Sequence, residues 1–304
     1  MKASPRDWFL LATLGVIWGA AFPVTRVAVV DFEPFTLTAG RLAIGALALA
    51  VVLALRGEGL PGLGERRFWL FAIGAAVMTN ALPFTLLSWA QRHVDASFAG
   101  VAVATVPLFV LPLAHFLVAG ERMSLRKVLG FLLGFVGIVV LIGPDLSAFE
   151  MASPVLVLAQ IACLGVAFCY ASGSIIAKLA PQLGLLRFAC ASLVLATAMS
   201  LPLALVVEGL PAPPSLEGLA AMAYLGLVPT GLAQVLLLSV IASAGPSFLS
   251  LVNYQVPVWA VLGSVIFLGE ALNPRLGLAL AIIFAGLAIS QNLVGLRRGG
   301  HARG

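Results

Sequence analysis

Residues 97–142 read SFAGVAVATVPLFVLPLAHFLVAGERMSLRKVLGFLLGFVGIVVLI, and residues 247–291 read SFLSLVNYQVPVWAVLGSVIFLGEALNPRLGLALAIIFAGLAISQ. With one gap of a single residue, the two stretches match in chain order: Ser97-Phe98 with Ser247-Phe248, Val106-Pro107 with Val256-Pro257, Gly120-Glu121 with Gly269-Glu270, Arg126 with Arg275, and Gly137 with Gly286. Both stretches are too apolar to remain in water. An internal duplication of this kind predicts a repeated architecture embedded in a lipid bilayer.

The composition of the whole chain agrees with this interpretation. Of its 304 residues, 62% are hydrophobic and 10% are charged, and the mean hydropathy is +1.12. A soluble domain of this length cannot bury so much apolar surface, whereas a helix needs roughly 20 apolar residues to cross a bilayer. The sequence therefore predicts an all-α integral membrane protein with ten transmembrane helices, over residues 8–30, 34–55, 68–90, 94–118, 125–143, 154–180, 184–206, 218–241, 245–268 and 275–295.

The duplication divides these helices into two repeats of five, over residues 1–150 and 151–304. Links between the predicted helices are short, so no soluble domain of useful size is expected. Lys2 and Arg6 precede the first apolar run, as they would in a signal peptide. That run is too long for a signal peptide, and nine more follow it. We therefore expect the first stretch to remain as a transmembrane helix.

The positions of lysine and arginine predict the orientation, because these residues concentrate in cytoplasmic loops. With the N-terminus inside, the outer loops carry Arg92 and Arg275, and the inner segments carry Lys2, Arg6, Arg56, Arg66, Arg67, Arg122, Arg126, Lys127, Lys178, Arg297, Arg298 and Arg303. Both termini are therefore predicted to be cytoplasmic. A repeat with an odd number of helices inserts its second copy in the opposite direction, so the two repeats are predicted to be inverted.

This pattern resembles the EamA family of the drug/metabolite transporter superfamily. The resemblance covers essentially the whole chain. It rests on two five-helix repeats, each with a proline-bearing helix, a Gly-Glu exit and a glycine-rich last helix: Val106-Pro107 and Gly120-Glu121, then Val256-Pro257 and Gly269-Glu270. The resemblance implies a ten-helix carrier of the bacterial inner membrane with a central cavity between its halves. Many relatives export amino acids or related metabolites, and the resemblance suggests a branch similar to the YddG-type amino-acid exporters.

Polar side chains within the spans are the candidates for contact with a solute, because lipid leaves such groups unpaired. On the ninth predicted helix, Ser250, Asn253, Tyr254 and Pro257 share one face. Pro257 has no N–H and frees a backbone carbonyl near Asn253, and Pro107 is expected to do the same on the fourth helix. Interrupted helices at corresponding places in two repeats point to a binding site. The alternative is that these prolines only kink the helices so that they pack.

Two further groups of residues complete the candidate site. In the register of the repeats, Asn80 pairs with Thr230 and Phe84 with Gln234. Methionine adapts to several solute shapes, although Met78 could equally belong to the packed core. The predicted substrate-binding residues are Asn253, Asn80, Tyr254, Ser250, Trp18, Met78, Thr79, Gln160, Cys163, Tyr170, Thr230 and Gln234, and the predicted helix breaks for gating are Pro107, Pro257 and Pro83.

Arg41 is about two turns inside the second predicted helix and needs a partner there. Asp31 or Glu33 could reach it from the outer loop, which is the structural interpretation we favour, and a substrate carboxylate is the alternative. Glu121 and Glu270 are expected to accept backbone N–H groups that open the next helix along the chain. The small residues of GFLLGFVG at 130–137 and of the series Gly277, Ala281 and Ala285 are expected to allow close helix packing.

The predicted activity is the export of a small solute by alternating access around a central site. Asp and Glu are absent from the middle of every predicted span, so movement down a gradient is the simplest expectation, with His115 as the histidine to test for proton coupling. A neutral polar pocket with Met and aromatic residues suits zwitterionic amino acids. The alternatives are a carrier of another metabolite class, such as drugs or nucleotide sugars, and a membrane channel.

Other functional classes find less support in the sequence. It contains no HExxH or GxSxG pattern and no acid pair within a span, so an enzyme is not expected. Cys163, Cys169 and Cys190 lie within predicted spans without metal-ligand spacing, and we predict no cofactor and no metal site. The net charge of +5 follows the cytoplasmic loops and does not indicate nucleic acid. The expected partners are the solute and the lipid bilayer, and the expected state is a monomer.

Overall fold

The structure is a computed structural model that describes residues 4–142 and 153–291. All the regular elements within these residues are helical. In chain order they are α1 (Pro5–Ala28), α2 (Pro34–Leu55), α3 (Arg66–Ala75), the π-helix η1 (Ala76–Ala81), α4 (Leu82–Ala90), α5 (Ala96–Val103), α6 (Val106–Leu117), α7 (Leu125–Ile142), α8 (Pro154–Leu179), α9 (Leu185–Val207), α10 (Leu216–Leu225), the π-helix η2 (Gly226–Leu232), α11 (Ala233–Ala244), α12 (Pro246–Leu249), α13 (Val252–Leu268) and α14 (Pro274–Ser290).

Each of the ten predicted stretches coincides with one of these helices or with a run of consecutive helices. Within the described residues, eight helical segments are long and apolar enough to span a membrane, and α13 and α14 are shorter apolar helices. Prolines in the first turn open several of them, because a helix leaves its first N–H groups unbonded in any case: Pro5, Pro34, Pro154 and Pro274. Residues 143 and 292–295, at the ends of two predicted stretches, lie outside the described residues.

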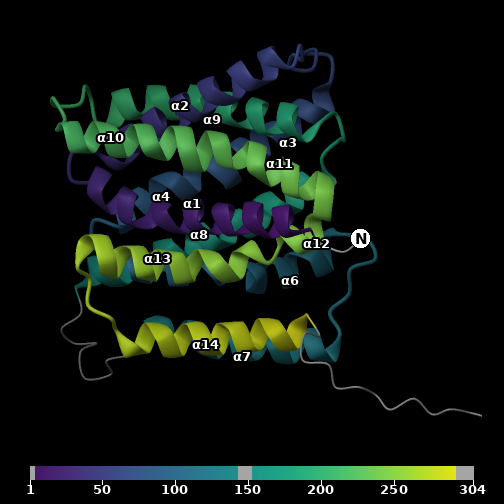
Figure 1. Ribbon diagram of the computed structural model, residues 1–304, viewed down its shortest axis with the longest axis vertical. Coiled ribbons are helices and arrows are strands. Elements are labelled where there is room, and N and C mark those ends of the chain that lie inside the picture. The colour runs from purple at the N-terminus through teal and green to yellow at the C-terminus, as the bar shows by residue number, and fades with distance from the viewer. Residues whose placement is uncertain (1–3, 143–152, 292–304) are drawn as a thin grey trace, which may run out of the picture.

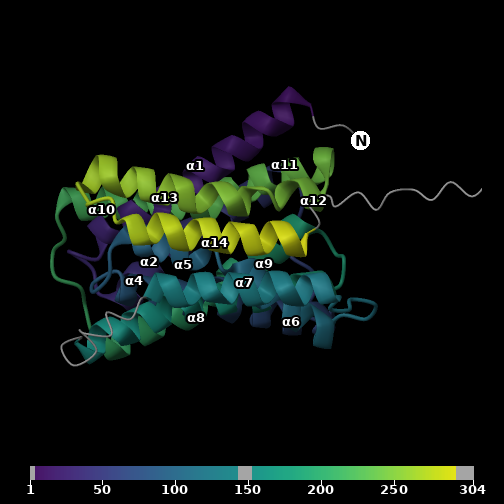
Figure 2. The ribbon, with the colours of Figure 1, turned by 90° about the horizontal axis from the view of Figure 1, so that it is seen from below.

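The helices run side by side in one bundle (Figure 1), with α2 and α9 toward the upper edge of that view and α7 and α14 along the lower edge. Figure 2 shows the same bundle turned by 90°, with α14 again beside α7. The largest helix contacts join α7 to α14, α2 to α9, and α1 to α13. Each of these pairs takes one helix from each half of the sequence, so the two halves share one packed core.

Glycines let α7 and α14 approach closely. A Cβ atom added at Gly130 would lie 2.4 Å from the carbonyl oxygen of Gly286, and one added at Gly286 would lie 2.5 Å from the carbonyl oxygen of Gly130. The close packing predicted for 130–137 is therefore confirmed. The prediction for Gly277, Ala281 and Ala285 is wrong, because these residues are exposed. The face that α14 buries instead contains Ala279, Ile283, Gly286 and Leu287.

Four interruptions divide the long segments. The π-helices η1 and η2 start at positions 150 residues apart, in the third and eighth segments. The fourth segment breaks at Ala104 and Thr105, directly before Val106 and Pro107. The ninth segment breaks at Ser250 and Leu251, and Pro257 lies within the continuous helix α13. Both halves therefore contain interrupted helices, but the break in the ninth segment precedes its proline by more than one turn.

The two ends of the bundle differ in charge. At the end that we call the acidic end, the loops and the first turn of α10 carry Asp31, Glu33, Asp95, Glu208, Glu217 and Glu270. Contacts of α1 with α11 and α12, and of α6 with α8, define the opposite end, which we call the basic end: Asp7–Ser243, Trp8–Phe248 and Glu121–Lys178. Its loops and adjoining helix ends carry Arg6, Arg56, Arg66, Arg67, Arg122, Arg126, Lys127 and Lys178. Successive segments alternate between the two ends, as membrane-spanning helices do.

Candidate functional site

The π-helix η2 exposes a backbone carbonyl that a neighbouring side chain then binds. Pro229 has no N–H, so the carbonyl of Leu225 four residues earlier loses its usual helical donor. The Thr230 hydroxyl donates to this oxygen at 2.7 Å. In η1 the Asn80 amide donates in the same way to the carbonyl of Ala75, at 3.3 Å. Irregular backbone inside a bundle persists where side chains satisfy it, and π-helical turns are frequent at functional sites.

Both of these side chains also reach a helix of the other half. Thr230 accepts a hydrogen bond from Nε of Arg41 on α2 at 2.8 Å, and Asn80 donates to the Ser192 hydroxyl on α9 at 3.4 Å. Arg41 is the eighth residue of α2, and Ser192 is the eighth residue of α9. The two contacts therefore occupy equivalent positions in the two halves. One is made with a charged side chain and the other with a neutral hydroxyl.

Arg41 is buried, with 7% of its surface exposed. Its guanidinium carbon lies 3.8 Å from the centroid of the Phe84 ring on α4. Tyr170 on α8 packs against the same apolar cluster that contains Phe84. The expected partners Asp31 and Glu33 are both engaged elsewhere, with Ser215 and with Arg92 respectively. The favoured prediction of an Arg41 ion pair with one of them is wrong, because the side chain turns inward toward η2.

Several other predicted residues lie beside this group. The indole N–H of Trp18 donates to the carbonyl of Pro229 at 3.3 Å. Thr79 lies against α8, where a Cβ added at Gly173 would be 3.0 Å from its methyl carbon, one turn beyond Tyr170. We call the set formed by Trp18, Arg41, Phe84, Tyr170 and Thr230 the central layer. It joins α1, α2, α4, α8 and η2, and Asn80 lies buried at the equivalent position of η1.

The remaining predicted residues lie outside the central layer. Cys163 is completely buried in an apolar cluster with Leu87 and Ala102. Tyr254 packs its ring 5.2 Å from Phe284 of α14, and its hydroxyl is buried without a hydrogen-bond partner among the described residues. Asn253 is exposed on α13, and Pro83 and Pro257 are buried. Partly exposed positions are occupied by Met78, Gln160, Gln234 and Pro107.

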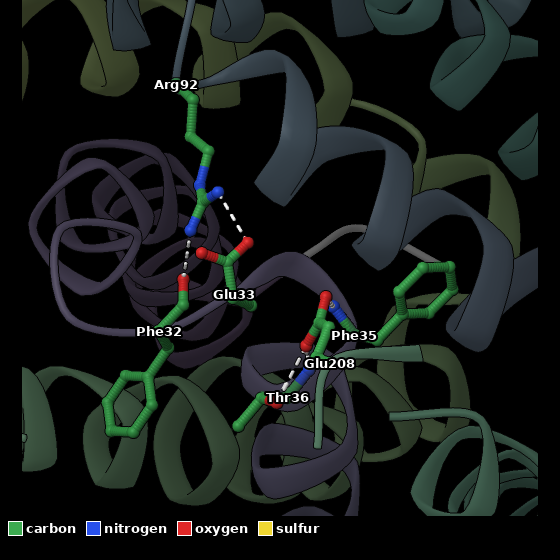
Figure 3. Close-up of polar contacts among 6 residues, drawn as sticks. All are labelled: Phe32, Glu33, Phe35, Thr36, Arg92 and Glu208. Carbon is green, nitrogen blue, oxygen red and sulfur yellow. Dashed lines mark hydrogen bonds and ion pairs between the residues drawn. The ribbon is translucent and has the colours of Figure 1, made fainter. Parts of the chain in front are cut away.

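An open cleft of about 710 Å³ lies at the acidic end between α2, α4 and α9. Figure 3 shows its polar contacts. The Glu208 carboxylate, just after α9, accepts hydrogen bonds from the backbone N–H groups of Phe35 and Thr36 at 2.9 and 2.8 Å. Arg92 forms an ion pair with Glu33 at 2.6 Å. A carboxylate is favourable at this place because a helix N-terminus carries partial positive charge.

Glu270 makes a comparable contact at the same end. Gly269, with φ of 67°, ends α13 in the left-handed conformation that glycine adopts easily. Glu270 then accepts from the N–H groups of Ala96 and Ser97 at 2.8 and 3.0 Å, so it caps α5 in the other half of the chain. The expectation that it caps the next helix, α14, is wrong, because the Asn273 side chain caps that helix. Beside it, burial raises the pKa of the Asp95 carboxyl, the charge of Glu270 raises it further, and Arg26 opposes both.

A second open cleft, of about 630 Å³, lies at the basic end and includes Ser250 and His115 in its lining. Here Glu121 binds Lys178 at 3.1 Å and Lys127 at 3.5 Å. The hydrogen bond from Lys178 lowers the pKa of Glu121, and the charges of Lys178 and Lys127 act in the same direction. The expectation that Glu121 caps a helix is therefore wrong, because two lysines lie within its reach. Neither cleft is lined by residues of the central layer.

Sequence reasoning missed Glu208 and Ser192. Glu208 directly follows an apolar run, and Glu270 follows one after a single glycine. This shared position indicates that Glu208, like Glu270, could cap a helix at the same end of the bundle. Ser192 had no such signal, because a lone serine in an apolar helix usually bonds within its own helix. Within the described residues, no group of three or more His, Cys, Asp or Glu side chains could hold a metal ion.

Comparison with known proteins finds one family model that matches both halves of the chain. Residues 8–143 and 157–291 each match the model of the EamA-like transporter family. The chain is 30% identical over 301 residues to the "probable terminal-alkyne amino-acid exporter" of Streptantibioticus cattleyicolor. The aligned residues cover 98% of this chain and 97% of that protein. It is 27% identical over 281 residues to the "uncharacterized inner membrane transporter YedA" of Escherichia coli K12, covering 90% of this chain and 86% of that protein.

A solved structure supports the fold alone. A protein of known crystal structure, 22% identical in sequence, superposes with a TM-score of 0.66 over 93% of this chain and 97% of that one. The matching family and the two named relatives are transporters or exporters and not enzymes.

Proposed function

Because the chain belongs to the EamA-like transporter family, we propose that it is a secondary transporter that exports amino acids or related small metabolites across the bacterial inner membrane. The observation that carries this proposal is the central layer, where polar and aromatic side chains from both halves meet beside π-helical backbone. Sites built from interrupted helices near the bilayer midplane are typical of such carriers. The name of the relative from Streptantibioticus cattleyicolor supports amino acids as the first class to test.

The proposed topology is a pair of inverted repeats, 1–150 and 151–304, with both termini in the cytoplasm. The charge difference between the ends supports it, because the basic end would face the cytoplasm. Equivalent contacts support it as well, since Thr230–Arg41 and Asn80–Ser192 join the halves reciprocally. We propose that a single chain is the working unit.

The proposed mechanism is alternating access, in which the solute site opens to one end at a time. Interrupted helices in both halves supply places where a segment can bend, including the breaks before Pro107 and before Val252. At the acidic end, Glu208 binds backbone N–H groups at the start of α2, and Glu270 binds those at the start of α5. Contacts at the basic end join side chains at the surface. Opening and closing would exchange such contacts, which are individually weak.

The test is counterflow of labelled amino acids in liposomes that contain the purified full-length protein. Liposomes loaded with unlabelled amino acid should take up the same labelled amino acid faster than empty ones, because a carrier returns loaded from either side. A channel would show uptake without this stimulation by internal solute. If no amino acid among the common twenty is exchanged but a nucleotide sugar or a lipophilic drug is, the proposed substrate class is wrong.

The same liposomes test the expectation that transport needs no proton. His115 is exposed at the basic end, where its Nδ1 accepts from the N–H of Met123 at 3.3 Å. Substrate should move without a change in internal pH. Substrate-dependent proton movement that disappears in His115→Ala would contradict facilitated transport and leave the transporter assignment intact.

A further inference from the structure

Arg41 is a buried cation without an anionic partner in the part of the chain that the structure describes. It is the eighth residue of α2, so it lies about 10 Å along the helix from the acidic end. The salt bridges of the described residues involve Glu33, Glu58 and Glu121, and none includes Arg41. A cation at this depth is costly unless something compensates its charge.

The geometry of the guanidinium leaves one edge unused. Its Nε–H donates to the Thr230 hydroxyl at 2.8 Å. One face of the group lies over the Phe84 ring at 3.8 Å. The two terminal nitrogens, which together form the end-on fork of a guanidinium, carry four N–H groups and make no hydrogen bond within the described residues. These nitrogens are not among the fully buried unpaired atoms of the described residues, so each keeps some accessible surface.

Joining two helices does not explain the charge. At the equivalent place in the other half, Asn80 and Ser192 join η1 to α9 with neutral groups. The Arg41–Thr230 contact joins η2 to α2 in the same manner and would need no more than its Nε–H. The positive charge and the fork are therefore available for another purpose.

We propose that the Arg41 fork binds the carboxylate of the transported solute within the central layer. A guanidinium fork matches a carboxylate with two parallel hydrogen bonds. Thr230 and Phe84 hold the group in one orientation before the solute arrives, so less freedom is lost on binding. This inference rests on the proposed function and specifies the part of the solute that is recognised.

The charge balance favours a singly charged anionic group. One guanidinium neutralises one carboxylate in a poorly solvated site, whereas a phosphate dianion would leave a net negative charge there. The chemistry therefore points to solutes with a single carboxylate, and the ammonium group of an amino acid then needs a separate polar partner in the site. It also replaces the neutral pocket expected from the sequence with a pocket that contains a fixed cation.

The experiment compares L-leucine with L-leucinamide, which has the same side chain and ammonium group but no carboxylate. Each compound competes with labelled L-leucine in the counterflow assay, for the wild type and for Arg41→Met. If the amino-acid screen selects a faster substrate, that amino acid and its own amide replace this pair. The wild type should prefer the acid to the amide by between about 10-fold and 100-fold, the scale of a charge-assisted bidentate pair. In Arg41→Met the preference should fall to about 1.

Two further variants separate recognition from folding. Arg187→Met removes a cation from α9, where Arg187 pairs with Glu58 at 3.0 Å at the basic end, and should leave the preference unchanged. Arg41→Lys keeps the charge but has no fork, and should retain a preference reduced by about three- to tenfold. If Arg41→Met is not recovered as a folded protein, Arg41→Lys and the thermal shift produced by each compound decide the question.

The outcomes are distinguishable. If the wild type exchanges no amino acid, the proposed function fails. If the wild type exchanges leucine but Arg41→Met and Arg41→Lys keep the full preference for the acid, the carboxylate site is wrong and the proposed function stands. A uniform loss of transport that leaves the ratio unchanged in both variants would assign Arg41 a structural role and also contradict the inference.

Discussion

At the scale of single residues, Asn80 and Asn253 should behave differently although both are predicted to line the solute site. The Asn80 amide is buried and bonds to Ala75 and Ser192, whereas Asn253 is exposed on α13. Asn80→Ala should lower the free energy of unfolding by about 1–3 kcal/mol, because it leaves buried partners unsatisfied.

Asn253→Ala should leave stability unchanged and slow transport by about tenfold, the scale of one lost hydrogen bond to a solute. Denaturant titration and counterflow measure the two effects. Normal transport in both variants would show that neither asparagine contributes to the solute site.

A second residue-scale prediction concerns pH at the acidic end. The pKa of Asp95 is raised above 3.8 by burial and by the charge of Glu270. The folded protein therefore binds this proton more tightly than the unfolded chain does. The stability that results is complete below the ordinary pKa and is lost as pH rises through the raised pKa.

Asp95→Asn should consequently stabilise the protein at neutral pH and have no effect at strongly acidic pH. Melting temperature measured against pH tests this. Glu217→Gln, which removes one exposed negative charge from the first turn of α10 at the same end, is the control. A stabilisation by Asp95→Asn that is constant with pH would show that titration of Asp95 is not its cause.

At the scale of helices, the contact between α7 and α14 depends on the absence of side chains. Gly130→Ala should destabilise the protein by about 1–3 kcal/mol, because the added carbon would meet the backbone of Gly286 at 2.4 Å. Gly277→Ala on α14 is the matched control, since a Cβ there meets nothing within 4 Å. Thermal unfolding in detergent measures both. Equal melting temperatures for the two variants would mean that α7 and α14 can move apart with little loss in the free energy of unfolding.

At the scale of the whole molecule, the inverted arrangement predicts opposite labelling of equivalent loops. Ser124 follows α6 and Ala271 follows α13, and both residues are exposed. In cells whose outer membrane is permeabilised and whose inner membrane is intact, a membrane-impermeant maleimide should label Ala271→Cys but not Ser124→Cys. Cys163, Cys169 and Cys190 are buried and should give little background. Labelling of both variants from one side would contradict the inversion.

Helix number, helix type and the duplication could be read from the sequence, because hydropathy along a segment is a local property. The ten predicted stretches coincide with helical segments, and the matching of 97–142 with 247–291 agrees with two matches to one family model. Close packing at 130–137 was likewise visible as spaced glycines. The register of the repeats also pairs Asn80 with Thr230, and each of these side chains contacts a helix of the other half.

Only the tertiary structure decided which polar groups meet. Arg41 turns to Thr230, 189 residues away in sequence, and not to nearby Asp31 or Glu33. Tyr254 faces Phe284, and Cys163 lies in the apolar core. Glu121 and Glu270 occupy matching positions in sequence, yet one binds lysines and the other caps α5. Composition and spacing determine that a helix must enter the bilayer, but the partner of each buried group depends on how distant helices rotate and pack.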